Sequence, residues 1–318
     1  MEPARLTSHF ERFLRRRRSL FTGLFAVTLL GAASLKAADI EPRAYSNIPS
    51  GINFLVVGYA YTEGNVTFDP TIPIENAKLT LHSSLFAYAR SLDLWGTSGK
   101  LDIIIPEVWL SGTAEFQGQP KSRSVFGLAD PVCRFYVNLF GAPSLPLKEF
   151  AGYKQDTIIG MSLAVSVPLG QYDSQKLANI GTNRWYFKPE VGVSKVVGPL
   201  TLELAAGAYF YTDNNEPVRG NKLQQAPIYA VQGHLLHSFA PGMWGALDVI
   251  YYAGGETTLD GVPGDNSQQN WRFGGTFTFP IDRRNSIKLN GSTGLYSRTK
   301  SNFSLVGIYW QYSWGGGL

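Results

Sequence analysis

The feature that most constrains the fold is an alternation of apolar and small polar residues, seen most clearly in residues 157–167. Every second residue there belongs to an apolar set: Thr157, Ile159, Met161, Leu163, Val165 and Val167. The residues between them are mostly small or polar: Gly160, Ser162, Ala164 and Ser166. Because successive side chains of a β-strand point to opposite faces, this stretch predicts a strand with one apolar and one small, polar face. Pro168 and Gly170 end the strand, since proline cannot donate to a ladder and glycine permits a turn.

The same alternation recurs along the chain and predicts 12 strands. Their ranges are 51–62, 79–92, 101–116, 124–140, 157–167, 185–197, 200–211, 226–239, 243–253, 271–279, 286–298 and 304–314. Pro106 predicts a bulge or irregularity in the third strand, and the fourth contains Asp130-Pro131. Residues 141–153 form an unusually long connection that contains two prolines and several apolar residues. If the strands close into a barrel, we expect these apolar residues to pack against its periplasmic opening, together with the N-terminus of the mature chain.

The lengths of strands and connections indicate the fold class. Long polar connections alternate with short ones, which is the pattern of transmembrane β-barrels. Strands of ten or more residues can cross a bilayer at a tilt. A soluble β-sandwich would need shorter strands and a second apolar inner face. The sequence therefore predicts an all-β protein, a transmembrane antiparallel up-and-down β-barrel of about 12 strands.

The N-terminus has the features of a secretory signal peptide. Four consecutive arginines at 15–18 precede an apolar segment at 20–35, and Ala37 and Ala38 offer a cleavage position. The alternative is a permanent anchor, but a spanning helix needs about 20 apolar residues. We therefore expect residues 1–37 to be a cleaved signal peptide and residues 38–318 to be the barrel domain, exported to the bacterial outer membrane.

The charge balance argues against nucleic-acid binding. The net charge of the whole chain is +4, from 28 basic and 24 acidic residues. The leader holds seven of the basic and two of the acidic residues, which leaves 21 and 22, a net charge of −1. A single cysteine, Cys133, excludes an internal disulfide framework. The sequence predicts no cofactor and no metal site, because His234 and His237 lie on opposite faces of a strand.

Two motifs carry a family resemblance. Residues 167–173 read Val-Pro-Leu-Gly-Gln-Tyr-Asp, and residues 179–190 read Asn-Ile-Gly-Thr-Asn-Arg-Trp-Tyr-Phe-Lys-Pro-Glu. With His234, Trp244, residues 251–255 and Asp260-Gly261, they closely resemble the MetA-pathway phenol-degradation family of outer-membrane proteins. The resemblance covers roughly residues 40–314. It implies an outer-membrane barrel that takes up small, often aromatic or hydrophobic compounds.

Charged and aromatic residues on the polar faces of the strands are candidates for a solute path. A charge that faces lipid is costly, so these side chains should point into the lumen. There they either set selectivity or lock the lumen through mutual salt bridges. The candidates are Glu203, Asp248, Tyr252, Arg272, Lys288, Tyr296 and Arg298. The basic members of this set lie on late strands and predict a basic strip that favours aromatic acids over neutral phenols.

A second set of candidates lies in the loop after the fifth strand. Tyr172, Asp173, Asn183 and Trp185 either line an entrance or only stabilise the loop through Asx turns. His82 is expected to face the lumen and form hydrogen bonds there, because nothing in the sequence pairs it with a nucleophile and an orienting acid.

These observations predict a channel rather than an enzyme. We expect passive uptake of small hydrophobic or aromatic organic solutes, with the lipid bilayer and those solutes as partners, no nucleic acid, and an oligomeric state left open. A structural or surface-interaction barrel with a closed lumen is one alternative. An outer-membrane lipid hydrolase is another, and it would require a nucleophile and a base side by side at the outer rim.

Overall fold

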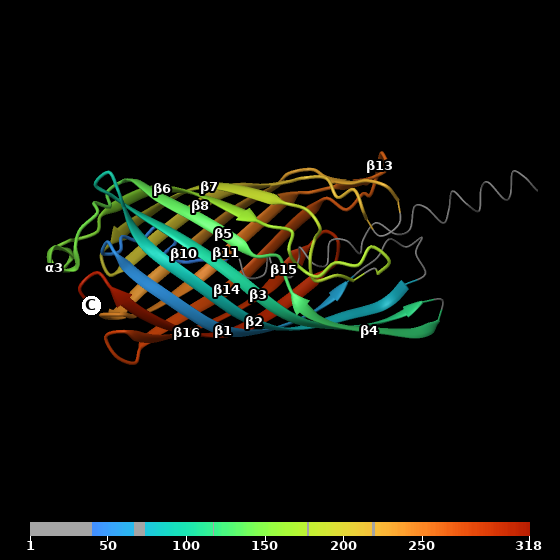
Figure 1. Ribbon diagram of the computed structural model, residues 1–318, viewed down its shortest axis with the longest axis horizontal. Helices are drawn as coiled ribbons and strands as arrows, with labels where there is room; N and C mark the ends of the chain where they lie inside the picture. Colours follow the sequence, from blue (N-terminus) through green and yellow to red (C-terminus); the bar gives the residue numbers. More distant parts are fainter. Residues whose placement is uncertain (1–39, 67–73, 117, 177, 218–219) are drawn as a thin grey trace, which may run out of the picture.

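The protein is a closed antiparallel β-barrel (Figure 1). The computed structural model describes residues 40–66, 74–116, 118–176, 178–217 and 220–318, so the predicted signal peptide lies outside the described residues. The wall is built from β1 (Ile52–Val66), β2 (Ile74–Leu94), β3 (Thr97–Phe116), β4 (Gln119–Leu128), β5 (Val132–Phe140), β6 (Thr157–Ser166), β7 (Tyr186–Val197), β8 (Leu200–Tyr211), β10 (Ile228–Ala240), β11 (Met243–Gly254), β14 (Gln268–Pro280), β15 (Asn285–Ser297) and β16 (Asn302–Gly315). Neighbours in the wall follow chain order, and the pairing of β1 with β16 closes it.

The predicted 12-stranded barrel is confirmed, with one difference. The fourth predicted strand, 124–140, is two strands, because β4 and β5 pair in turn with β3 and share one place in the wall. The register changes from Ile104↔Val132 to Glu107↔Leu128 across the break. Pro106 and Pro131 both lie at this point, and neither can donate to a ladder. The irregularity expected at Pro106 is thus present, and it also interrupts the partner strand.

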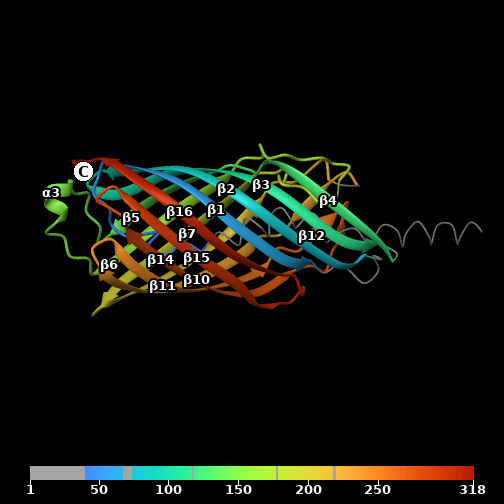
Figure 2. The same ribbon diagram turned by 90° about the horizontal axis from the view of Figure 1, so that it is seen from below.

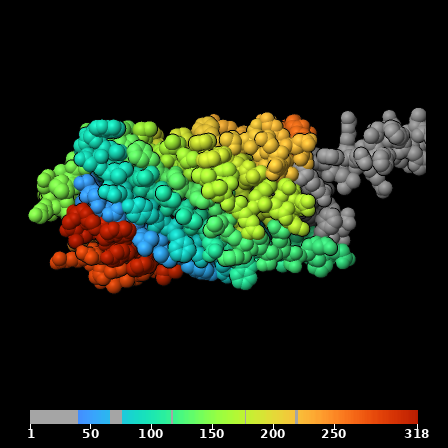
Figure 3. Space-filling model, in the orientation of Figure 1, coloured from blue at the N-terminus to red at the C-terminus, as the bar shows by residue number. Residues whose placement is uncertain are grey.

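The two ends of the barrel differ. Short turns, such as 95–96, 198–199 and 241–242, lie at one end, here called the turn end, with the short helix α3 (Leu147–Phe150) and the C-terminus (Figures 1 and 2). The other end, the loop end, carries the long connections apart from residues 141–156, which lie with α3 at the turn end. Two of these contain a small sheet of β9 (Leu223–Gln225), β12 (Thr257–Leu259) and β13 (Val262–Pro263), where the sequence predicted only loops. Figure 3 shows residues of these loops, yellow to orange, packed together over the loop end.

The outer wall is apolar and the inner wall is small or polar, as the alternation predicted. On β6 the side chains of Ile159, Met161 and Leu163 are exposed on the outer face, whereas Gly160 and Ala164 turn inward and are buried. Such an outer face suits contact with lipid hydrocarbon. None of the helices among the described residues is long and apolar enough to cross a membrane.

Residues 40–51, here called the N-terminal segment, lie inside the barrel rather than in its wall. At the turn end, the Ser50 N–H donates to the Leu145 carbonyl over 2.9 Å, and Asn47 Nδ2 donates to the Pro143 carbonyl over 3.1 Å. The expected contact between residues 141–153, the turn end and the N-terminal segment is therefore present. The expected burial is incomplete, because α3 has no buried residue.

Candidate functional site

The lumen holds a cavity of about 510 Å³ between the N-terminal segment and the inner wall. Its lining is rich in charged and hydrogen-bonding side chains, among them Glu41, Arg43, Lys100, Asp102, Arg134, Tyr136, Lys188, Glu190 and Lys288. A second, apolar space of about 60 Å³ is lined by Leu81, Val108, Leu110, Ile180 and Leu305. The two spaces adjoin, since Leu85, Pro106 and Tyr309 line both. The lumen thus combines an apolar pocket with a polar cavity.

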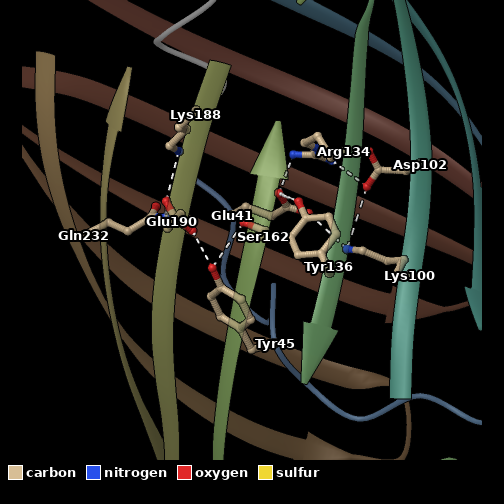
Figure 4. Close-up of polar contacts among 10 residues, drawn as sticks. All are labelled: Glu41, Tyr45, Lys100, Asp102, Arg134, Tyr136, Ser162, Lys188, Glu190 and Gln232. Carbon is tan, nitrogen blue, oxygen red and sulfur yellow. Dashed lines mark hydrogen bonds and ion pairs between the residues drawn. The ribbon is translucent and has the colours of Figure 1, made fainter. Parts of the chain in front are cut away.

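One carboxylate of the N-terminal segment, that of Glu41, is held by three side chains of the wall (Figure 4). Arg134 Nη1 donates to Glu41 Oε2, the Tyr136 hydroxyl donates to the same oxygen over 2.9 Å, and Lys100 Nζ lies 3.5 Å from Oε1. The register explains this convergence. Lys100 is directly opposite Tyr136, and Asp102 is directly opposite Arg134, so all four side chains share the inner face of β3 and β5.

Asp102 fixes the guanidinium of Arg134. Arg134 Nε lies 2.8 Å from Asp102 Oδ1, and Nη2 lies 3.0 Å from Oδ2, which is the bidentate geometry that suits a guanidinium and a carboxylate. Lys100 Nζ is 4.0 Å from the centroid of the Tyr136 ring. The donors that face Glu41 are therefore oriented by contacts within the wall.

The Glu41 carboxyl should stay ionised far into the acid range. Burial alone would raise its pKa, but the charges of Arg134, Lys100 and Lys288 hold the pKa well below its ordinary value of 4.5. A carboxyl with a depressed pKa stabilises the folded form above its unfolded pKa, and that stabilisation is lost only as the pH falls through the folded pKa.

Where the N-terminal segment controls the conductance of the barrel in lipid bilayers, we therefore expect the conductance to stay constant from about pH 8 down to about pH 3. The measurement is a pH titration of single-channel conductance. A Glu41→Gln variant, which lacks the titrating group, is the control for other acids. A conductance step centred near the ordinary carboxyl pKa in the wild type alone would contradict this expectation.

A second anchor of the N-terminal segment is Tyr45. Its hydroxyl donates to Glu190 Oε1 over 3.0 Å and lies 3.3 Å from Ser162 Oγ (Figure 4). Its ring lies over Gly160 and Gly192, which face each other directly on β6 and β7. A Cβ atom would come within 2.5 Å of the ring at Gly160 and within 2.2 Å at Gly192. The two glycines thus form a flat seat that no residue with a side chain could provide.

Glu190 is shared between the N-terminal segment and the wall. Lys188 Nζ and Gln232 Nε2 each lie 3.0 Å from Glu190 Oε2. Because Oε1 accepts from Tyr45, both oxygens of this carboxylate have partners. Burial, followed by the charge of Glu190, raises the pKa of Tyr45 far above its ordinary value. Tyr45 therefore remains a neutral hydrogen-bond donor at any physiological pH.

Glu203 forms a third anchor at the main chain of the segment. The Arg43 N–H donates to Glu203 Oε2 over 2.7 Å, and Ser194 Oγ donates to Oε1 over 3.0 Å. The Arg43 guanidinium lies 5.4 Å from the centroid of the Trp244 ring. Burial lowers the pKa of Arg43. Glu203 thus lies inside the lumen, where it contacts the N-terminal segment.

Four more predicted residues lie on the inner wall. Asp248 Oδ1 is 2.7 Å from His234 Nδ1, and Tyr252 is buried in an apolar cluster with Ile40. Arg272 Nη2 donates to Ser292 Oγ over 3.0 Å, while its Nε has no hydrogen-bond partner among the described residues. Lys288 Nζ lies 5.3 Å from the centroid of the Tyr309 ring.

Two predicted lumen residues lie elsewhere. Tyr296 is 55% exposed and is opposite Trp271 on the outer face. The reason is a bulge: Arg272 pairs with Gly294 but Trp271 pairs with Tyr296, so β15 has one extra residue and its faces exchange. Arg298 follows β15 at the loop end, where its Nη2 is 2.7 Å from Asp265 Oδ1. Arg298 is therefore not part of the predicted basic strip in the lumen.

His82 also differs from its prediction. Its Nδ1 is 2.6 Å from the Tyr59 hydroxyl, and its ring lies against Tyr61 and Trp109 on the outer wall. The physical reason is that β2 turns its apolar residues inward near the loop end. Leu79 and Leu81 fill the mouth of the barrel together with Leu110 and Ile180, which leaves the polar face outside.

The loop at 167–185 is fastened to the wall by Asp130, which is completely buried. Asp130 Oδ1 accepts the Gly170 N–H over 2.8 Å, and Oδ2 accepts the Thr182 N–H over 2.8 Å and the Thr182 hydroxyl over 2.6 Å. The break between β4 and β5 places this carboxylate under the loop. The same loop inserts Ile180 into the apolar mouth.

The predicted loop residues all make contacts that stabilise the loop. Asp173 Oδ1 accepts the Gln175 N–H over 2.8 Å, which is an Asx turn. The Tyr172 hydroxyl and Asn183 Nδ2 both connect to the neighbouring loop, at the Glu216 carbonyl and at Asn214 Oδ1. Trp185 stacks on Phe187 at the outer rim. A role at an entrance stays a prediction.

The sequence analysis missed the residues that hold the N-terminal segment. Residues 40–49 show no alternation of apolar and polar residues, so the sequence predicts no strand there and does not indicate which wall residues they contact. The wall residues could have been found, because Asp102, Arg134 and Glu190 lie on the inward parity of their strands, the criterion that selected Glu203 and Asp248. Among the residues that the structure describes, no group of three His, Cys, Asp or Glu side chains could hold a metal ion.

The fold is similar to that of solved outer-membrane proteins. An outer membrane channel from Pseudomonas putida F1 superposes with a TM-score of 0.72 at 17% identity, over 87% of this chain and 100% of that chain. At this identity the similarity concerns the fold alone. The translocator domain of the autotransporter NalP from Neisseria meningitidis gives a TM-score of 0.47 at 10% identity, over 91% of this chain and 98% of that chain.

No curated protein sequence matches the chain. A family model does match, over residues 48–312, and it agrees with the resemblance carried by the two motifs of the sequence. The chain therefore belongs to the family described as "Putative MetA-pathway of phenol degradation".

Proposed function

We propose that the protein is an outer-membrane channel through which small organic solutes, aromatic ones among them, cross by passive diffusion. The observation that carries this proposal is the cavity of about 510 Å³ inside a closed barrel with an apolar outer wall. A cavity of this size suits a small organic ligand. The family's description, which refers to phenol degradation, supports an aromatic solute. The partners of this function are the lipid bilayer and the solutes, and it involves no catalytic step, cofactor or nucleic acid.

The proposed path leads from the loop end to the turn end. Transmembrane barrels have long loops outside and short turns in the periplasm, so solutes would arrive at the loop end. There they meet the apolar pocket lined by Leu81, Val108 and Ile180. The polar cavity follows, with its charged groups and tyrosine rings. This order suits a solute with a planar apolar body and one polar group.

The test of this function is transport by the purified wild type. We expect single-channel conductance in planar bilayers and uptake of benzoate and of benzyl alcohol into liposomes. A second candidate function is a structural barrel with a closed lumen, which the N-terminal segment inside the barrel favours. The absence of both conductance and uptake would favour that second function.

Charge selectivity provides a sharper prediction. Replacing Arg272 and Lys288 together with Gln should lower the uptake of benzoate several-fold more than that of neutral benzyl alcohol, because both cations lie on the inner wall and attract anions. Arg298→Gln is the matched control, since Arg298 lies outside the lumen. An equal loss for both solutes would remove the selectivity and leave a nonspecific pore.

A further inference from the structure

The side chains that surround Glu41 form a carboxylate-binding arrangement that does not depend on Glu41 itself. Arg134 and Tyr136 come from β5 and Lys100 from β3, so the wall supplies every donor. Asp102 holds Arg134 by two hydrogen bonds and leaves Nη1 of the guanidinium for another acceptor. The acceptor is the only part of the arrangement that belongs to the N-terminal segment rather than to the wall.

The charges of this cluster favour a bound anion. Lys100 and Arg134 contribute two positive charges and Asp102 one negative charge, so the wall alone carries a net charge of +1 at this point. Lys288 lines the same cavity as Glu41 and adds a further positive charge there. Buried charges without a partner are strongly unfavourable. An anion at this position neutralises the remaining positive charge, and Glu41 supplies that anion in this structure.

The surroundings of the carboxylate suit an aromatic ring. The Tyr136 ring lies beside the Glu41 carboxylate. The Tyr45 ring is edge-on to the Tyr136 ring, and the two ring centroids are 6.2 Å apart. Ile104, Val132 and Ala164 line the same cavity. Aromatic and apolar surface next to a guanidinium group that offers Nη1 as a donor is the composition of a site for a single-ring carboxylic acid.

We propose that Lys100, Arg134 and Tyr136 form a binding site for aromatic monocarboxylates on the solute path, and that Glu41 occupies it as a tethered competitor. This inference rests on the proposed channel function, and it names a solute class for it. A solute carboxylate replaces the Glu41 carboxylate on the same three donors, and the N-terminal segment loses one of its anchors when that happens. The apparent affinity for the solute is reduced by the fraction of molecules in which Glu41 fills the site.

The experiment measures binding of benzoate to the full-length protein in detergent by titration calorimetry. We expect Glu41→Ala to bind benzoate at least about tenfold more tightly than the wild type, which corresponds to about 1.4 kcal/mol. Glu41→Gln should behave in the same way, so the result does not depend on one variant folding well. Adding Arg134→Gln to Glu41→Ala should abolish the gain. Glu63→Ala, which removes an exposed glutamate of the outer wall, is the control and should match the wild type.

Neutral benzyl alcohol separates the site from general access to the lumen. Its binding should change little in Glu41→Ala, because it has no charge for Arg134 and Lys100 to bind. Equal benzoate affinity in the wild type, Glu41→Ala and Glu41→Gln would overturn the proposal, as would an equal gain for benzyl alcohol.

Liposome uptake distinguishes failure of this site from failure of the channel. Uptake of benzoate by the wild type without any change of affinity in the Glu41 variants would overturn the site and leave the channel standing. A gain in benzoate affinity in proteins that transport no solute would support the site and refute the channel.

Discussion

Replacing Gly192 with Leu should displace the N-terminal segment and raise the single-channel conductance several-fold. A Cβ atom at Gly192 would lie 2.2 Å from a ring carbon of Tyr45, so the ring cannot keep its seat. Overpacking of this kind costs about 1–3 kcal/mol. Tyr45 would lose its hydrogen bond to Glu190 at the same time. The segment that fills part of the lumen thereby loses its second anchor.

The matched control is Gly275→Leu. Gly275 also lies in a wall strand, but its side chain would point outward, and the nearest atom to its Cβ is 3.5 Å away. Tyr45→Ala should raise the conductance by itself, and adding Gly192→Leu to it should have no further effect, because the clash requires the ring. Unchanged conductance in both Gly192→Leu and Tyr45→Ala would show that the N-terminal segment does not restrict the lumen.

The second large effect is expected from Asp130→Ala, which should release the loop at 167–185. The substitution leaves two buried donors without an acceptor, the N–H groups of Gly170 and Thr182, and the Thr182 hydroxyl keeps only the Arg184 carbonyl at 3.2 Å. Losing such a buried, charged acceptor should cost about 3 kcal/mol of local stability. Proteolysis in the native state follows the population of the open form, so tryptic cleavage after Lys176 should accelerate about 100-fold.

Asp173→Ala is the control in the same loop. Asp173 is exposed and its side chain accepts one hydrogen bond, from the Gln175 N–H, so cleavage should change little. Asp130→Asn should behave almost like Asp130→Ala, because one of its two acceptor positions becomes an NH₂ group that faces a donor. Equal cleavage rates for wild type and Asp130→Ala would show that other contacts hold the loop.

The alternation of the strands made the wall and much of the lumen predictable. Asp248, Arg272 and Lys288 were placed inward because a charge on the opposite parity would face lipid. The same rule failed at Tyr296, because the extra residue in β15 exchanges the two faces of the strand. The types of residue around this bulge do not reveal it in the sequence. The alternation rule therefore fails where a bulge exchanges the faces of a strand, as at Tyr296, and where the apolar face of a strand turns inward, as at His82.

The N-terminal segment could not be predicted for a different reason. It has no period, and its contacts join residues far apart in the sequence, such as Tyr45 and Glu190, which are 145 positions apart. Its position depends on the geometry of the finished lumen, including the seat formed by Gly160 and Gly192. Glycines in strands signal close approach of another group, but not which group approaches.

The pairing of β1 with β16 has a consequence for assembly in the membrane. Partners in this seam, such as Tyr59 and Ile308, come from opposite ends of the barrel domain, and contacts of such sequence separation form late and slowly. The N-terminal segment directly precedes β1 and lies inside the wall that this seam closes. A chain that lacks β16 would keep the edges of β1 and β15 unpaired and open to association with other chains. The last fourteen-residue strand therefore completes the wall around the segment and removes the unpaired edges through which the chain could associate with others.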